Sequence, residues 1–213
     1  RLAYWICDRV GALAYRLLPR QRLAVRANLM RVVGAGGEDL ERLVKATFRE
    51  GVRYYYDTFR VPALTDAQVE GLIALSGWEY VEQALARGNG AIIATAHLGS
   101  PSFVAHILVL KGCKVTTPAE PVKNHRTLEL MNRVRGSRGI RLVPIGPTTT
   151  RELTEVLRRN EVIGAVVDRD VQKNGVTVDF FGRATTMTSG PVLLALRTGA
   201  AVVPGFTYRR SGG

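Results

Sequence analysis

Three apolar runs of this 213-residue sequence end in side chains that can transfer protons or hold charge. His97 closes the first run, Glu120 follows the second, and the triplet Asp168-Arg169-Asp170 follows the third. An imidazole has an ordinary pKa near 6.5, so His97 is a candidate general base at neutral pH. A carboxylate within hydrogen-bond reach would fix its tautomer, and Glu120, at the next strand end along the chain, is the expected partner. A capping or core role for His97 and a solvated loop position for Glu120 are the structural alternatives.

The triplet and the segment after the second run supply candidate binding groups. Arg169, placed between Asp168 and Asp170, is suited to hold a phosphate or a thioester-bearing donor, with the two carboxylates orienting it or a substrate hydroxyl. A structural ion cluster at a strand end is the alternative. Basic residues also crowd the segment after the second run, including Lys123 and Arg135. Such a charge run is usually a solvated face, but beside an active cleft it would cradle an anion.

Several other chemistries lack their sequence patterns. Ser102 and His106 have the i, i+4 spacing of a helical pair, but no GxSxG motif surrounds the serine, which disfavours a serine hydrolase. His106 lies in an apolar stretch and is expected to pack there. No phosphate-binding glycine loop is present, and the three histidines have no paired Cys or His at metal-ligand spacing. The sequence therefore predicts no bound metal and no cofactor.

The elements that must position these residues alternate from residue 88 onward. Apolar runs of strand length alternate with stretches of helical period, which is typical of a mainly parallel sheet with helices on both faces. The expected strands are 91–96, 114–117, 141–144, 162–167, 176–180 and 201–206. The expected helices are one that follows the turn at 99–101 and extends toward residue 110, and those at 127–135, 150–159 and 190–197. In such α/β sheets, sites lie beyond the carboxyl ends of the strands, where the candidate residues stand.

Residues 1–75 have the pattern of a helical lead-in to an α/β core at 76–213. One apolar stripe runs along the first helix, at Ile6, Val10, Leu13 and Leu17. Arginines surround this stripe, which is typical of an amphipathic helix at a membrane interface, and a core helix with a solvated basic face is the alternative. Charged residues interrupt the apolar run well short of the roughly 20 residues that a spanning helix needs. We expect one domain over 1–213, truncated at its C-terminus because it ends directly after an apolar run.

The composition describes a globular chain with an unusual charge. Thirty Lys and Arg against 18 Asp and Glu give a formal net charge of +12, and 46% of the residues are hydrophobic. Cys7 and Cys113 form no CxxC pair, which disfavours a zinc ribbon, a redox motif and a disulfide framework. The charge suits nucleic acid, an anionic membrane surface or small phosphorylated substrates. Nucleic acid is the least favoured, because the aromatic residues cluster instead of alternating with basic ones.

Several short motifs follow one another in order along the chain. They are Ala96-His97-Leu98-Gly99, Ala119-Glu120, Val167-Asp168-Arg169-Asp170, Asp179-Phe180-Phe181-Gly182-Arg183 and Ala195-Leu196-Arg197-Thr198-Gly199-Ala200. Their order resembles the bacterial lysophospholipid-acyltransferase-like family, which includes the lipid A biosynthesis acyltransferases and the phosphatidylinositol mannoside acyltransferases. The arginine-rich start looks like the family's helical lead-in, so the resemblance covers nearly the whole chain. Glu120 and the triplet fit the mannoside branch better.

The resemblance implies transfer of a fatty acyl group from acyl-CoA or acyl carrier protein to a hydroxyl of a glycolipid. A single acyltransferase domain would act peripherally on the cytoplasmic face of the cytoplasmic membrane, without a cofactor. His97 would be the general base, with Glu120 relaying charge, and Lys123 and Arg135 would lie near an anionic group of the substrate. The implied partners are the donor, a phosphatidylinositol-mannoside-like or lipid-A-like acceptor and an anionic membrane surface, with no nucleic acid.

One position departs from the family pattern. The family's signature places Asp or Glu five residues after the histidine, and Ser102 occupies that position here. Serine cannot supply a negative charge. Either Glu120 alone orients His97, or activity is weakened, or the chain is a non-catalytic lipid-binding relative.

Overall fold

The structure is a computed structural model that describes residues 2–34, 36–120, 129–130, 133–134, 136 and 138–210. The chain divides into two compact units. The first, called here the helical unit, contains Arg1–Phe59 and Asp179–Arg183. The second, called the sheet unit, contains Arg60–Val178 and Ala184–Gly213. The division falls after Phe59, ahead of the boundary at residue 75 that the sequence suggested.

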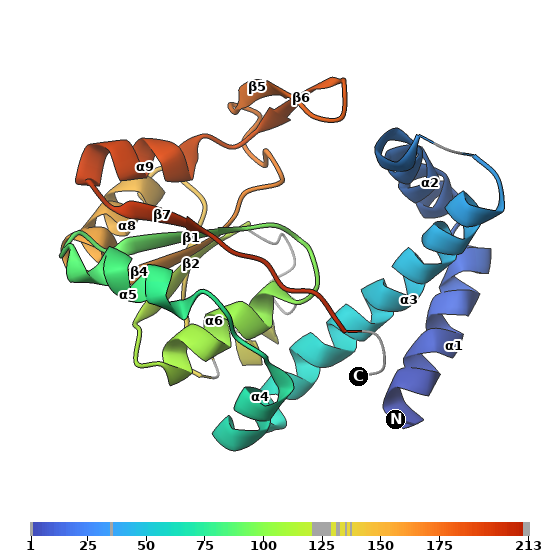
Figure 1. The fold of residues 1–213 in the computed structure, drawn as a ribbon, viewed down its shortest axis with the longest axis horizontal. Coiled ribbons are helices and arrows are strands. Elements are labelled where there is room, and N and C mark those ends of the chain that lie inside the picture. The colour runs from blue at the N-terminus through green and yellow to red at the C-terminus, as the bar shows by residue number, and fades with distance from the viewer. Residues whose placement is uncertain are drawn as a thin grey trace. The chain divides into compact units, whose positions relative to one another are not determined.

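Three helices make up most of the helical unit (Figure 1). They are α1 (Leu2–Leu17), α2 (Pro19–Val33) and α3 (Glu38–Arg60). Pro19 follows the end of α1 and is the first residue of α2, a helix that was not predicted from the sequence. Proline is tolerated at the first helical position because its missing N–H would have no intrahelical partner there. None of the residues of α2 is buried, so no regular apolar stripe revealed this helix in the sequence.

The helix α1 packs on α3 through a glycine and an ion pair. A Cβ on Gly11 would lie 2.6 Å from the Cα of Arg49, so glycine permits the close approach of the two backbones. Beside it, both oxygens of Asp8 accept hydrogen bonds of 2.8 Å from Arg53. Half-buried, two-point pairing of this kind fixes the orientation of the two helices.

The apolar stripe of α1 lies on its outer side. The exposed fraction of the residue is 48% for Ile6, 47% for Val10, 54% for Leu13 and 66% for Leu17, and 54% for the neighbouring Trp5. The structure thus does not place this stripe in a core. Within the described part of the chain, every helix is too short or too polar to cross a membrane.

Five strands of the sheet unit pair in parallel, in the order β3-β2-β4-β1-β7. Their bounds are β1 (Ala91–Thr95), β2 (Val115–Ala119), β3 (Arg141–Pro144), β4 (Val162–Val166) and β7 (Ala201–Pro204). The helices are α4 (Asp66–Leu72), α5 (Trp78–Ala86), α6 (Pro101–Leu110), α8 (Thr149–Arg158) and α9 (Gly190–Thr198), and a 3-10 turn, η1, spans Val61–Ala63. The predicted α/β class with a mainly parallel sheet is confirmed.

Helices cover both faces of this sheet (Figure 1). On one face, Ile93 packs with Val81 of α5 and Leu108 of α6. On the other face, Ile92 packs with Val156 of α8 and with residues of α9. Adjacent residues of β1 thus face opposite layers, as the two-residue period of a strand requires. The burial of each such aliphatic side chain stabilises the fold by about 1.5–3 kcal/mol.

The order of the strands in space differs from their order in the chain. β4 lies between β1 and β2, with Thr95 of β1 opposite Val166 of β4. Because all five strands are parallel, their carboxyl ends share one edge, where the residues that follow β1 and β4 are direct neighbours. The strand predicted at 176–180 belongs to no part of this sheet. It is β5 (Val176–Asp179), which forms a separate hairpin with β6 (Ala184–Met187).

Candidate active site

His97 lies at the carboxyl edge of the sheet, two residues beyond the end of β1, and Asp168 holds it there. Its ring Nδ1 is 2.8 Å from Oδ1 of Asp168, and its backbone N–H donates to Oδ2 of the same carboxylate at 3.1 Å. Asp168 lies two residues beyond the end of β4. The Val167 N–H donates to the Thr95 carbonyl at 2.8 Å, so the backbone hydrogen bonds between β1 and β4 continue up to the site. Both oxygens of one carboxylate thus fix one histidine.

This contact assigns the two ring nitrogens different tasks. With Asp168 ionised, Nδ1 carries the proton and donates it, which leaves Nε2 with a lone pair. The side chain of His97 is 48% exposed, so the imidazole can meet a substrate. An imidazolium formed on Nε2 would be stabilised by the carboxylate at the opposite nitrogen. The arrangement is that of a general base with its positioning partner.

The carboxylate on His97 is Asp168 and not Glu120, which corrects the expectation from chain order. Among the described residues, the charged partner of Glu120 is Arg169, whose Nη1 lies 3.5 Å from Oε2 of the glutamate. Glu120 follows β2, and β4 separates that strand from β1. Since neighbouring strands lie about 4.8 Å apart, β2 is roughly 10 Å from β1. Asp168 at the end of β4 is therefore the nearer group.

Arg169 and Glu120 form an accessible ion pair beside this dyad. Their side chains are 61% and 50% exposed, so solvent screens the pair and it contributes little to stability. Both groups can therefore exchange their partner for a ligand at low cost. Arg169 remains a candidate for holding an anionic group, as predicted from the triplet.

The side chain of Asp170 binds backbone N–H groups of the segment that follows it. Its carboxylate accepts hydrogen bonds from the backbone N–H groups of Asn174 at 3.3 Å and Gly175 at 3.0 Å. A Cβ on Gly175 would lie 2.2 Å from the Met187 carbonyl oxygen, so this turn needs glycine as well as the aspartate. The three consecutive residues of the triplet thus have different contacts. Asp168 contacts His97, Arg169 pairs with Glu120, and Asp170 binds the backbone at the start of the β5–β6 hairpin. Lys123 and Arg135, the other predicted binding residues, lie outside the described residues.

A threonine that the sequence analysis missed holds the loop after His97. The hydroxyl of Thr207 accepts from the Ser100 N–H at 2.8 Å and donates to the Leu98 carbonyl at 3.0 Å. Gly99 has φ +63, and a Cβ there would lie 2.3 Å from the Thr207 carbonyl oxygen. Segments 107 residues apart in sequence thus form one unit around the histidine. The sequence signal that could have indicated Thr207 is its position as a hydroxyl residue shortly after the apolar strand β7, at the same edge of the sheet as His97.

Ser102 and His106 both belong to α6, and neither takes part in the dyad. Ser102 is the second residue of the helix, so the position of the family's acidic residue lies in its first turn. His106 is 2% exposed and its Nδ1 has no partner among the described residues, as expected for a packed histidine. Burial, and to a lesser extent the charge of Arg138, lowers the pKa of His106 to about 4. It is therefore neutral at physiological pH.

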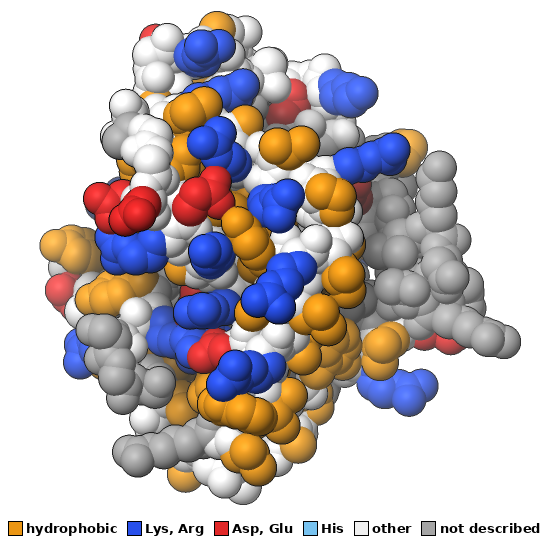
Figure 2. Space-filling model, turned by 90° about the vertical axis from the view of Figure 1, so that its right-hand side faces the viewer, with side chains coloured by type: hydrophobic (Ala, Val, Ile, Leu, Met, Phe, Trp, Pro, Cys, Tyr) orange, Lys and Arg blue, Asp and Glu red, His pale blue; other side chains and the backbone are white. Residues whose placement is uncertain are grey.

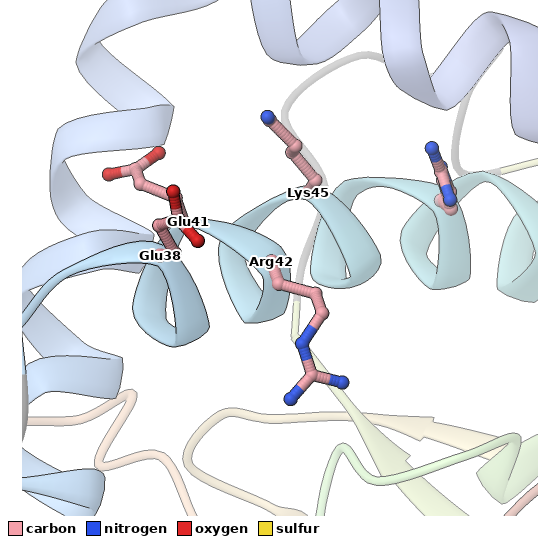
Figure 3. Close-up of a pocket in the computed structure, with 5 residues that line it drawn as sticks. Glu38, Glu41, Arg42 and Lys45 are labelled. Carbon is pink, nitrogen blue, oxygen red and sulfur yellow. The ribbon is translucent and has the colours of Figure 1, made fainter.

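Two hollows elsewhere are lined by groups that already serve the fold. One, of about 570 Å³, lies at the amino edge of the sheet, where Arg159 pairs with Glu161 at 3.1 Å. The other, of about 330 Å³, lies along α3 and is lined by charged residues of that helix alone; Figure 3 shows Lys45 and Arg42 pointing in different directions. Its Glu41 accepts from Tyr15 and Arg26, and the Tyr15 hydrogen bond is the main cause of its lowered pKa. Neither hollow presents a base with a free ring nitrogen.

Comparison with known proteins gives these residues a context. The family described as bacterial lipid A biosynthesis acyltransferase matches residues 1–213. The phosphatidylinositol mannoside acyltransferase of Mycolicibacterium smegmatis is 34% identical over 184 residues, which cover 84% of this chain and 60% of that protein. The protein of the same description from Mycobacterium tuberculosis is 33% identical over 186 residues, which cover 84% of this chain and 59% of the relative. The chain thus spans about 60% of the length of these relatives.

Proposed function

The chain belongs to the bacterial lipid A biosynthesis acyltransferase family, and from this premise we propose that it transfers a fatty acyl group to a hydroxyl of a phosphatidylinositol-mannoside-like glycolipid. The family predicted from the order of the motifs is confirmed. The observation that carries the proposal is the dyad at the carboxyl edge of the sheet, where Asp168 holds His97 at 2.8 Å.

The proposed reaction uses His97 first as a base and then as an acid. Nε2 takes the proton of the acceptor hydroxyl, and the oxygen of this hydroxyl attacks the carbonyl carbon of the donor thioester. The tetrahedral intermediate collapses with cleavage of the carbon–sulfur bond, and the leaving thiolate takes the proton from the imidazolium. The products are an ester and a free thiol. A positioned base of this kind accelerates a reaction by about 10²–10⁴-fold.

The donor is proposed to be acyl-CoA or acyl carrier protein, with its phosphate near Arg169. The guanidinium is 61% exposed and its partner Glu120 is 50% exposed, so an anion can approach it. Guanidinium groups bind phosphate through two parallel hydrogen bonds. Glu120 is then a neighbour of the donor-binding arginine and not the partner of the base.

The enzyme is proposed to act peripherally on the cytoplasmic face of the membrane. The stripe of α1 leaves Leu13 54% and Leu17 66% exposed, and arginines lie beside it. Figure 2 shows Lys and Arg side chains interspersed with hydrophobic ones over the viewed face, with few Asp or Glu. This combination is typical of a helix lying in an anionic membrane interface.

A thiol-release assay tests the proposal. Palmitoyl-CoA is incubated with phosphatidylinositol dimannoside in vesicles, and free CoA and acylated lipid are both quantified. We expect the wild-type chain to form both products in equal amounts and His97→Ala to lose about 10²–10⁴-fold in rate. Arg158→Ala, an exposed change at the far edge of the sheet, is the control and should retain activity. Equal turnover by wild type and a folded His97→Ala would refute the assignment of the base.

The second candidate function is that of a non-catalytic lipid-binding relative, which Ser102 favours because it replaces an acidic residue of the family. This alternative requires vesicle binding by the wild-type chain without thiol release from any donor. The presence of Asp168 on His97 argues against it, since the negative charge that Ser102 lacks is supplied from β4.

A further inference from the structure

The turn between β5 and β6 has an unusual residue at its tip. Phe180 and Arg183 exchange two backbone hydrogen bonds of 2.9 and 3.3 Å, which leaves Phe181 and Gly182 as the two central residues. Both have positive φ, +52 for Phe181 and +70 for Gly182. Two consecutive positive φ angles define a type I′ hairpin turn, in which Asn-Gly is the preferred pair.

Phenylalanine is a strained choice for this position. The left-handed region brings the Cβ of an ordinary residue too close to the backbone, at a cost of about 1–2 kcal/mol. Asn and Gly accept it readily, but a bulky aromatic residue there is an outlier. Asp179 compensates in part, since its Oδ1 accepts the Gly182 N–H at 2.9 Å. A turn braced around a strained residue indicates that the side chain itself has a task.

The two rings that this turn presents are open to solvent. Phe180 is 49% and Phe181 is 55% exposed, and their ring centroids lie 4.7 Å apart in an edge-to-face arrangement. The rings therefore support one another and keep a defined shape. Arg183 follows Phe181 after one glycine, so an apolar pair and a cation stand together at the end of a narrow hairpin.

The surroundings of the tip favour a lipid surface as its partner. Asp179–Arg183 belongs to the same compact unit as α1–α3, which carries the exposed apolar stripe with Trp5. In residues 1–59, 11 Lys and Arg stand against 6 Asp and Glu, so this unit is electrostatically complementary to an anionic bilayer. Aromatic rings beside an arginine are typical of segments anchored at the headgroup level of membranes.

We propose that the hairpin tip formed by Phe180, Phe181 and Arg183 is a lipid anchor, which inserts its two rings into the interface of an anionic bilayer in addition to the contact made by α1. The proposal rests on the membrane location in the proposed function. It explains why a strained phenylalanine stands where asparagine would suit the backbone better.

The change Phe181→Asn separates anchoring from folding. Asparagine fits the type I′ turn better, so we expect thermal stability to stay equal or rise, while affinity for vesicles of phosphatidylglycerol and phosphatidylcholine falls about tenfold. Phe180→Thr keeps strand propensity and should weaken vesicle binding to a similar extent. Leu196→Ser is the matched control, because Leu196 is 79% exposed but lies on α9 in the sheet unit. It should leave vesicle binding unchanged.

The outcomes decide between the anchor and its competitors. Vesicle binding that is unchanged in both Phe variants, as measured by co-sedimentation, overturns the anchor. If those variants bind vesicles normally but raise the KM for palmitoyl-CoA, the tip contacts the donor and the anchor is again overturned. If wild type itself does not bind anionic vesicles, the membrane location fails together with the anchor. Wild-type binding with a tenfold loss in Phe181→Asn, and none in Leu196→Ser, supports it.

Discussion

The loop after β1 and the middle of α6 each contain a histidine, and the two residues are nine positions apart in sequence. Their surroundings differ in exposure and in the charge beside the ring. His97 is 48% exposed and has a carboxylate on Nδ1. His106 is 2% exposed, its Nδ1 has no partner among the described residues, and its pKa is lowered by burial and, to a lesser extent, by the charge of Arg138. The first environment is the one expected around a general base, whereas the second keeps the ring of His106 neutral at physiological pH.

The second region shows what a structural histidine looks like. Arg138 donates to the carbonyls of Val61 and Leu64 and pairs with Asp66, so it fastens η1 and the start of α4. Phe103, from the same helix as His106, packs with Val61 in the adjoining apolar cluster. A histidine in such surroundings is part of the packing. The comparison teaches that the residue type alone does not select a candidate base, and that an anionic partner together with an open ring face does.

The largest effect that would test this contrast is expected from Asp168→Asn. The amide can donate to Nδ1, which favours the wrong tautomer, so we expect kcat to fall about 10²–10⁴-fold with folding intact. Introduced into His97→Ala, the same change should lower the residual rate by less than about threefold, because the two residues act as one unit. Steady-state thiol release measures both. Additive losses would show that Asp168 acts independently of the histidine.

The next effect concerns stability and belongs to His106. Its pKa is about 4 in the folded chain and near 6.5 in the unfolded chain, so between these pH values the unfolded state binds the extra proton. The burial of neutral His106 therefore makes the free energy of unfolding depend on pH. This free energy is at its full value above pH 6.5 and falls by roughly 3 kcal/mol as the pH is lowered to 4.

Chemical denaturation between pH 4 and 7 measures this slope. His106→Leu should remove that part of the pH dependence whatever it does to stability at pH 7. If the variant kept the slope of the wild type, the burial of a neutral imidazole would not be its source.

A smaller effect is expected from Glu120→Gln, which tests the corrected partner of the base. Because Glu120 faces Arg169 at 3.5 Å and not His97, the loss in kcat should stay within about tenfold, and the main change should be in the KM for the donor. Asp168→Asn is the comparison under the same conditions. A loss from Glu120→Gln as large as that from Asp168→Asn would restore the glutamate as the charge relay.

The smallest effect is expected from Ser102→Asp, which returns the acidic residue of the family pattern. Since Asp168 already supplies the charge on His97, kcat should change by less than about threefold. An acid in the first turn of α6 should raise stability by about 0.3–1 kcal/mol through the helix dipole. Thermal unfolding and thiol release on the same preparation measure the two quantities. A large gain in kcat would show that the dyad alone is incomplete.

Much of the fold was predictable because local patterns decided it. The apolar runs at 91–96 and 162–167 became β1 and β4, and the stripe between 150 and 159 became α8, nearly at the expected bounds. α2 was missed because none of its residues is buried and its periodicity is weak. β6 was missed because its residues 184–187 are mostly exposed and form only a two-stranded hairpin.

The candidate site was only partly predictable. The order of the predicted strand ends along the chain placed His97, Glu120, Asp168 and Arg169 at one sheet edge. The pairing among them did not follow from that order, and neither did the role of Thr207, which stands 107 residues beyond its partner Ser100. Contacts of this kind depend on how distant segments meet, which a local pattern does not encode.

The sequence by itself determined the class of fold, the family and the edge at which chemistry is expected, because hydrophobic periodicity and motif order are local properties. Only the tertiary structure decided which carboxylate serves the histidine. Because β4 lies between β1 and β2, Asp168 lies 2.8 Å from the His97 ring, whereas Glu120 pairs with Arg169. Strand order results from the packing of whole βα units on a sheet, and the neighbours of a strand in the chain do not reveal its neighbours in space.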